Sequence, residues 1–298
     1  MPSTTLKYPT QPYSKVNRYD TRGENQPPTN SLHTSQYSPT DHRPQASYAL
    51  ETIHQIVNTC PILHVSFAAP DSPFPTMLPM IGQMGSFARP SADTGDVLEL
   101  YLHGYVSSRL MNLARKADDN GSAEANGLPI TIGASHVDGL VLSLTPNSHS
   151  YNYRSATLFG QAVPVTDVAE KLYAMQLITE GIVRGRWAGT RVPPNGAEMQ
   201  STSVLRVSIA AGSAKVRTGM PSDDRADMED GALLDRVWTG VVPVHYAMGE
   251  PMPSPYNRVE KVPAYLEEFR TGFNDDAVEG AVEAATKSMA AKAKKGDS

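Results

Sequence analysis

The chain has 298 residues, of which 40% are hydrophobic, and it contains 24 prolines and 22 glycines. This composition is typical of a folded protein with an ample core and many turns, and it excludes a fibrous or wholly disordered chain. The 26 basic residues are outnumbered by 31 acidic ones, so the net charge is -5 and we expect no nucleic-acid partner. A small molecule is the expected partner.

Cys60 is the only cysteine, which excludes an internal disulfide and a metal site built from cysteines. No apolar run approaches the roughly 20 residues of a membrane helix, and the first residues lack the apolar segment of a secretory signal. No regular spacing of metal ligands stands out, and the acidic residues of segment 223–230 are expected to form a solvated loop. We therefore expect a cytoplasmic protein that binds neither a membrane nor a metal ion.

The first 45 residues are rich in Pro, Ser, Thr, Asn and Gln, which predicts an extended N-terminal arm. Spaced apolar residues could nevertheless lay this arm over a folded surface: Tyr8, Tyr13, Val16, Tyr19, Leu32 and Tyr37. Residues 46–58 have helical spacing of apolar side chains, and Pro61 ends that helix. The segments ILHVSFAA, TMLPMIGQM and VLELYLH then predict three antiparallel strands joined by short loops.

Residues 97–116 change period in the middle. A buried strand ends at His103-Gly104, and a helix over 107–116 begins with Ser107, Ser108 and Arg109. Backbone N–H groups, two hydroxyls and a guanidinium then face one spot, which is a candidate phosphate site. Arg109 is equally compatible with a solvated position on the helix surface.

Further strands are expected from LPITIGAS and VDGLVLSLTP, which would join near Ser135 and His136, and from residues 152–166, with a bulge at Gly160. A helix capped by Asp167 is expected over 167–183, a strand from 202 toward Lys215, a strand over 236–246 and a C-terminal helix or tail over 267–295. Dinucleotide-binding, P-loop, HExxH and GxSxG motifs are absent from the sequence.

At least six strands with two packed helices predict a mainly β protein, a six-stranded antiparallel barrel. The expected domain organisation is an arm over 1–45, a barrel domain over 46–250 and a helical extension or tail over 251–298.

Several segments, in this order, resemble the flavin-nucleotide-binding proteins of the pyridoxamine 5'-phosphate oxidase-like superfamily, to which nitroimidazole-resistance proteins are related. They are PTMLPM, LYLHGYVSSRL, DGLVLS, NYRSATLFGQA, GRWAGTRVP, VLRVSIAAGSAKVRTGMPSDD and VWTGVVPV. The resemblance implies an FMN-binding split β-barrel that forms a homodimer with the cofactor between the subunits. It extends from about residue 17 to residue 244.

The resemblance implies which residues hold FMN. His103, Gly104, Ser107, Ser108 and Arg109 match the turn that holds the flavin phosphate, although Leu110 stands where relatives commonly have lysine. On neighbouring strands the implied contacts are Met77, Pro79 and Met80 beside the ring, Arg154 at the phosphate or ribityl chain, and Ser155 at the ring edge. Lys215 and Trp187 are further candidates.

His103 is the candidate catalytic residue, because histidine exchanges a proton near neutral pH, but a structural role for a single histidine is the common case. Pro79 cannot donate a ladder hydrogen bond, which predicts a strand edge there. Arg154 and Ser155 are neighbours on a strand and therefore face opposite sides.

The resemblance implies an FMN-dependent oxidoreductase that transfers hydride or electrons through the flavin. The basic strand residues and the ring-side glutamine of true pyridoxamine 5'-phosphate oxidases are missing, so a different small-molecule substrate is expected. Two alternatives stay open: a haem-binding or haem-degrading protein with His64, His103 or His136 as axial ligand, and a non-catalytic flavin carrier or sensor.

Overall fold

The computed structural model describes residues 45–47, 49–119 and 127–287. Six of its strands close an antiparallel barrel in the order β7-β4-β3-β2-β5-β6, because β6 also pairs with β7. The strands are β2 (Leu63–Phe67), β3 (Thr76–Gly85), β4 (Glu99–Tyr105), β5 (Leu128–Leu142), β6 (Ser150–Pro164) and β7 (Thr202–Arg217). The predicted mainly β fold with a six-stranded barrel is confirmed.

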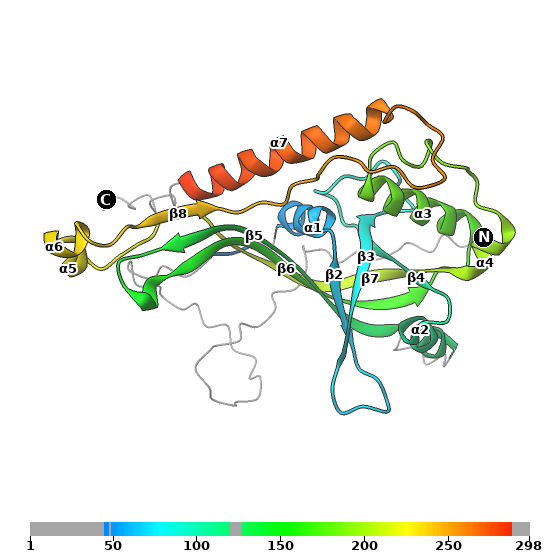
Figure 1. The fold of residues 1–298 in the computed structure, drawn as a ribbon. Coiled ribbons are helices and arrows are strands. Elements are labelled where there is room, and N and C mark those ends of the chain that lie inside the picture. Colours follow the sequence, from blue (N-terminus) through cyan, green and yellow to red (C-terminus); the bar gives the residue numbers. More distant parts are fainter. Residues whose placement is uncertain (1–44, 48, 120–126, 288–298) are drawn as a thin grey trace, which may run out of the picture.

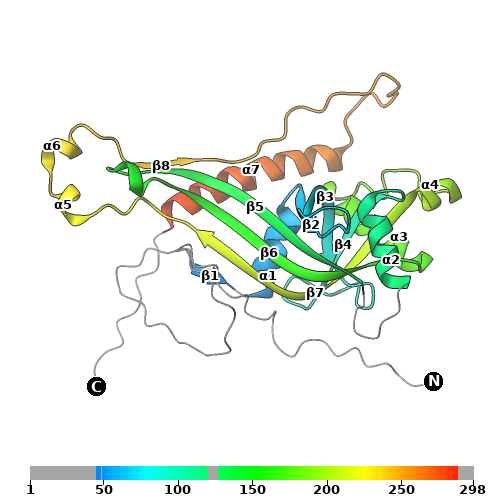
Figure 2. The ribbon, with the colours of Figure 1, turned by 90° about the horizontal axis from the view of Figure 1, so that it is seen from below.

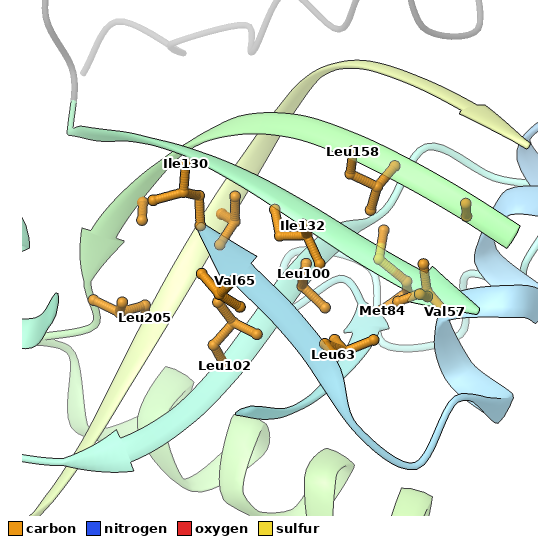
Figure 3. Packing of buried hydrophobic residues seen from close by; sticks show 14 of the residues in the cluster. Val57, Leu63, Val65, Met84, Leu100, Leu102, Ile130, Ile132, Leu158 and Leu205 are labelled. Carbon is orange, nitrogen blue, oxygen red and sulfur yellow. The ribbon is translucent and has the colours of Figure 1, made fainter. Parts of the chain in front are cut away.

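The barrel interior is filled by the alternate side chains of its strands, because successive residues of a strand point to opposite faces. In β4, for example, Leu100 and Leu102 are fully buried in the same core as Leu63 and Val65 of β2. Figure 3 shows these aliphatic side chains directed toward one another from strands that surround them.

Two helices add side chains to this core from different ends of the barrel. Helix α1 (Leu50–Thr59) buries Ile53 and Val57, and α2 (Arg109–Asp119) buries Leu110 and Met111. The α1 end is fastened by the carbonyl oxygen of the Asn58 side chain, which accepts a hydrogen bond from the backbone N–H of Met84 at 2.7 Å.

Helix α3 (Val168–Ile182) covers part of the barrel's outside, over β3, β4 and β7. Its N-terminus is capped as expected, because the Asp167 carboxylate accepts a hydrogen bond from Glu170 N–H at 2.7 Å. Beneath the helix, the Tyr101 hydroxyl donates to the Glu170 carboxylate at 3.0 Å, and Arg206 pairs with the same carboxylate at 3.1 Å. These contacts hold α3 in place.

Beyond the barrel, β5 and β6 continue as a long ribbon to which β8 (Gly240–Pro243) adds a strand. Helix α7 (Ala264–Thr286) lies along β5 and β8 and buries three alanines, as Figures 1 and 2 show. On the other edge, β1 (Gln45–Ser47) pairs with β7. The short elements are the 3-10 helix η1 (Pro146–Ser148), α4 (Gly196–Ser201), α5 (Arg225–Met228) and α6 (Gly231–Leu234).

Two expectations about strands are wrong. The two strands expected to join near Ser135 and His136 form the single strand β5, because a register shift between Val137 and Gly139 lets the pairing with β6 continue. The strand expected over 236–246 is limited to four residues, and Pro243, which has no N–H to donate, is its last residue.

The expected domain boundaries stay predictions. Apart from Gln45, the arm over 1–45 lies outside the described residues, and so do residues 288–295 of the expected C-terminal helix. Among the helices that the structure describes, none combines the length and apolar character required to cross a bilayer.

Candidate functional site

Several exposed side chains line the part of the barrel that α3 leaves uncovered. We call this the outer face, and its members are His64 and Ser66 of β2, Met77, Pro79 and Ile81 of β3, and His103 and Tyr105 of β4. Strand register places Met77 opposite Ser66, Pro79 opposite His64, and Ile81 opposite His103. Met77 is 61% exposed and Tyr105 is 66% exposed, so apolar surface is open to a ligand or a second chain.

Pro79 lies at a free edge, as predicted. The pairing of β3 with β4 begins at Ile81, so the first half of β3 pairs only with β2. The missing N–H of Pro79 therefore breaks no ladder with β4. Arg109, the first residue of α2, reaches the β2–β3 loop just before this part of β3 through its ion pair with Asp71.

The β4–α2 junction is held by local contacts. The Ser108 hydroxyl accepts a hydrogen bond from Met111 N–H at 3.4 Å, and the Ser108 carbonyl accepts one from Asn112 N–H at 3.0 Å. A Cβ on Gly104 would approach the Met111 terminal methyl group to 2.7 Å, so a larger residue there would require the flexible Met111 side chain to move. In this arrangement His103, Gly104, Ser107, Ser108 and Arg109 lie next to one another, as expected.

The Arg109 guanidinium forms an ion pair with Asp71 of the β2–β3 loop. Both side chains are exposed, at 45% for Arg109 and 74% for Asp71. An ion pair this exposed stabilises a fold by only about 0 to 1 kcal/mol, so an anionic ligand can compete with Asp71 for the guanidinium. A phosphate can therefore displace Asp71 from Arg109 with little loss of folding stability.

The His103 side chain points outward, and no hydrogen bond joins its ring to the described part of the chain. Partial burial among its neighbours lowers the pKa of the imidazole below 6.5. The neutral ring therefore predominates at neutral pH, and it can accept a proton from a group on the outer face.

The remaining predicted strand residues do not all share this face. Met80 points inward and packs against the core, because it is three residues from Met77 on the same strand. Arg154 makes two hydrogen bonds, both 2.9 Å long, to the buried carboxylate of Asp138. Ser155 points the other way and donates to the Lys215 carbonyl at 3.2 Å. The predicted opposite orientation of Arg154 and Ser155 is present in the structure.

Lys215 and Trp187 lie on other elements. The Lys215 ammonium stands 5.8 Å from the centre of the Tyr153 ring on the exposed side of β6 and β7. Trp187 lines a pocket of about 460 Å³ with Leu172 and Tyr173 of α3. The structure does not bring Trp187 together with the outer-face residues.

Of the three histidines considered as haem ligands, His64 and His103 share the outer face and His136 does not. His64 belongs to the outer face, whereas His136 is buried and its Nε2 lies 3.2 Å from the Thr59 hydroxyl. His64 pairs with Gly133, three residues from His136 on β5, so the two histidines face opposite sides of the sheet.

A second hollow, which we call the bulge pocket, was not identified in the sequence. It has a volume of about 330 Å³ and lies where the register of β6 and β7 shifts between Phe159 and Gly160. Ser66, Thr131 and Gln161 bring polar groups to it. The predicted bulge at Gly160 was the available signal, but sequence alone does not reveal which strands border it.

Comparison with known proteins places this fold. Residues 50–216 match the family described as pyridoxamine 5'-phosphate oxidase. No curated protein matches the chain.

Three solved structures are similar to this chain over most of their own lengths. The flavocytochrome Anf3 from Azotobacter vinelandii is 29% identical, with a TM-score of 0.59 over 76% of this chain and 92% of that one. An FAD and heme binding protein from Mycobacterium smegmatis is 24% identical, with a TM-score of 0.61 over 76% and 97%. A putative 5-nitroimidazole antibiotic resistance protein from Bacteroides thetaiotaomicron is 18% identical, with a TM-score of 0.42 over 58% and 87%.

Proposed function

The chain belongs to the pyridoxamine 5'-phosphate oxidase family, and on this premise we propose that it binds a flavin nucleotide on the outer face and acts as an oxidoreductase. The flavocytochrome from Azotobacter vinelandii, at 29% identity, supports the flavin by its description. The observation in this chain that supports the proposal most is the exposed apolar surface of β3, formed by Met77 and Ile81, together with Arg109, which pairs with Asp71 in the loop before β3.

The residues present fit a flavin nucleotide in two respects. Met77 and Ile81, 61% and 40% exposed, offer apolar surface to one side of a planar ring. Arg109 and the N–H groups at the start of the 11-residue helix α2 suit a phosphate, since a helix N-terminus favours a negative charge. Met80 and Arg154 are engaged elsewhere in the fold and are left out of the proposed site.

A bound flavin would supply the transfer of hydride or electrons, while the protein sets its position and surroundings. In this proposal Arg109 anchors the phosphate, Ser107 and Ser108 offer hydroxyls to it, and the neutral His103 imidazole accepts a proton from a substrate bound against the outer face. FMN is the expected nucleotide. FAD, named for the Mycobacterium smegmatis structure, is the other form to be tested.

We also propose that the active form is a homodimer with the flavin between the subunits. Met77 and Tyr105 remain largely exposed in the single chain, and a patch of this kind commonly marks an interface. A second copy would cover the ring from the side opposite β3 and exclude water from it.

A haem-only protein has less support, because the flavocytochrome from Azotobacter vinelandii and the FAD and heme binding protein from Mycobacterium smegmatis both carry a flavin by description. A non-catalytic flavin carrier remains the second candidate, because the residues proposed to hold the flavin would bind it whether or not a reaction follows.

The test is an absorption spectrum of the purified full-length chain, before and after incubation with FMN or FAD and removal of free nucleotide. Oxidised flavin bands retained with the protein support the proposal, and chromatography of the released nucleotide distinguishes FMN from FAD. No retained flavin would refute it, and a Soret band without flavin would favour haem. Reduction of the bound flavin by a nicotinamide nucleotide, followed by turnover with an acceptor, separates the oxidoreductase from the carrier.

A further inference from the structure

We infer that the bulge pocket binds a small, uncharged, planar molecule whose edge carries an amide-type N–H and C=O, and that Gln161 recognises this edge. The pocket lies on the outside of the barrel, where β2, β5, β6 and β7 meet. It is separate from the phosphate-binding turn at Arg109, and Ser66 is the one outer-face residue that also lines it.

The main observation is an unpaired polar atom in Gln161. Its Oε1 is buried and has no hydrogen-bond partner among the described residues. Within that part of the chain one other buried side-chain polar atom lacks a hydrogen bond, Arg206 Nε, and it lies 3.5 Å from the Glu99 carboxylate. Buried acceptors are nearly always paired in native proteins, and Gln161 also lines the bulge pocket, so its Oε1 requires a donor from outside the chain, which is either a water molecule or a ligand.

A bulge in β7 shapes this pocket, because Phe159 pairs with Ala211 and Gly160 with Ile209, so Ala210 is the extra residue. The pairing of β6 with β7 shifts between Phe159 and Gly160, which brings Gln161 opposite Ser208. A Cβ on Gly160 would lie 2.6 Å from the Ser208 carbonyl oxygen, so the two strands approach this closely only with glycine there. The backbone register at the bulge therefore sets where the lining side chains Phe159 and Gln161 stand.

The lining defines the chemistry of the ligand. Phe159, Pro75 and Pro129 provide apolar surface, and no charged side chain lines the pocket, which favours an uncharged planar ring. The hydroxyls of Ser66 and Thr131 lie on paired strands, and neither has a hydrogen-bond partner in the described part of the chain. The Gln161 amide can accept from an N–H and donate to a C=O on the same edge of the ligand, as a carboxamide or lactam requires.

Strand register connects this pocket to the outer face. Thr131 pairs with Ser66, and Ser66, which lines the pocket, pairs with Met77, so the pocket borders the strand next to the proposed ring position. We infer that the molecule bound here is a substrate held beside the flavin; this part rests on the proposed function, whereas the recognition of an amide edge does not. A flavin ring also carries a lactam edge, and the experiment must distinguish the two sources.

The experiment compares two probes that share an aromatic ring and a carbonyl group on the full-length protein. Benzamide has the amide edge, and methyl benzoate has the ring and the carbonyl but no N–H. Titration calorimetry is expected to give benzamide an affinity at least about fivefold higher, since a buried acceptor gains a partner only from benzamide. Equal affinities, or no binding of either probe, would overturn the inference.

Gln161→Met removes the amide and is expected to abolish the preference for benzamide. Gln176→Met is the matched control, because Gln176 lies on α3 at the other pocket, and it should keep the preference. Preference retained in Gln161→Met would overturn the role of this residue. Thermal denaturation checks the fold of both variants, and the comparison of probes on the unmodified protein decides the question if Gln161→Met does not fold.

Repeating the titration on flavin-loaded protein identifies the source of the amide edge. Binding that persists indicates a separate small molecule, and binding lost on loading indicates that the flavin ring itself fills the bulge pocket. Protein that retains no flavin yet prefers benzamide would refute the proposed function and leave this inference standing. Protein that retains flavin without any preference for benzamide would support the proposed function and refute this inference.

Discussion

Replacing Arg109 by alanine tests the proposed phosphate site most directly. A hydrogen bond to a charged group is worth about 1.5 to 3 kcal/mol, and the 45% exposure of Arg109 lowers this to about 1 to 2 kcal/mol through solvent screening. We therefore expect the flavin dissociation constant to rise about 5- to 30-fold, measured by quenching of flavin fluorescence at low ionic strength. Added salt should weaken binding to the unmodified protein more than to Arg109→Ala.

The partner variant sharpens this test. Asp71 competes with the phosphate for the same guanidinium, so Asp71→Asn should tighten flavin binding by up to about fivefold, but only while Arg109 is present. Arg89→Ala is the control, because Arg89 forms an ion pair of similar exposure with Asp96 in the loop before β4. Unchanged affinity in Arg109→Ala, or equal loss in Arg89→Ala, would remove Arg109 from the site.

The other predictions concern the fold that carries the site. Gly160→Ala should destabilise the protein by about 1 to 3 kcal/mol in urea titration, because its Cβ would meet the Ser208 carbonyl at 2.6 Å, whereas Gly196→Ala, with nothing within 4 Å, should have little effect. Leu158→Ala, at a fully buried position, should cost about 2 to 5 kcal/mol, and a smaller loss would mean that the core closes around the cavity. Burial raises the pKa of the Glu99 carboxyl group above its usual 4.5, so the free energy of unfolding should fall as the pH rises from about 4.5 through the pKa of the folded state. Glu99→Gln should lack this fall. Equal pH dependence of the two proteins would show that Glu99 is not the group responsible.

Much of the fold could be predicted because the strands carry a clear period. In β4, buried Leu100 and Leu102 alternate with outward-facing side chains, and in α3 the capping residue Asp167 marks the first turn. The two wrong strand predictions concern segments whose extent depends on which strand they pair with. The continuity of β5 depends on a register shift against β6, and the partners that set it are distant in the sequence.

In the candidate site, too, the residues that are neighbours in the sequence could be predicted to lie together, whereas contacts between distant residues could not. The junction around His103, Gly104 and Arg109 is contiguous in the sequence, so its side chains could be grouped before the structure was known. Contacts between distant residues could not be foreseen. Asp71 reaches Arg109 from another loop, and Asp138 holds Arg154 by two hydrogen bonds on the face opposite Ser155.

The positions of Met80 and Gln161 show why alternation along a strand matters more than proximity in the sequence. Met77 and Met80 are three residues apart, and that odd spacing sends one to the outer face and the other to the core. Gln161 follows the bulge at Gly160, where the register shifts, so its neighbours across the strands can be read only from the closed barrel. A closed barrel whose strands bulge at one point opens a hollow in its outer wall while its interior stays filled, and here that hollow leaves a buried amide oxygen unpaired. We therefore expect a ligand to be recognised at the bulge, where Gly160 lets two strands approach and Gln161 Oε1 lacks a partner among the described residues.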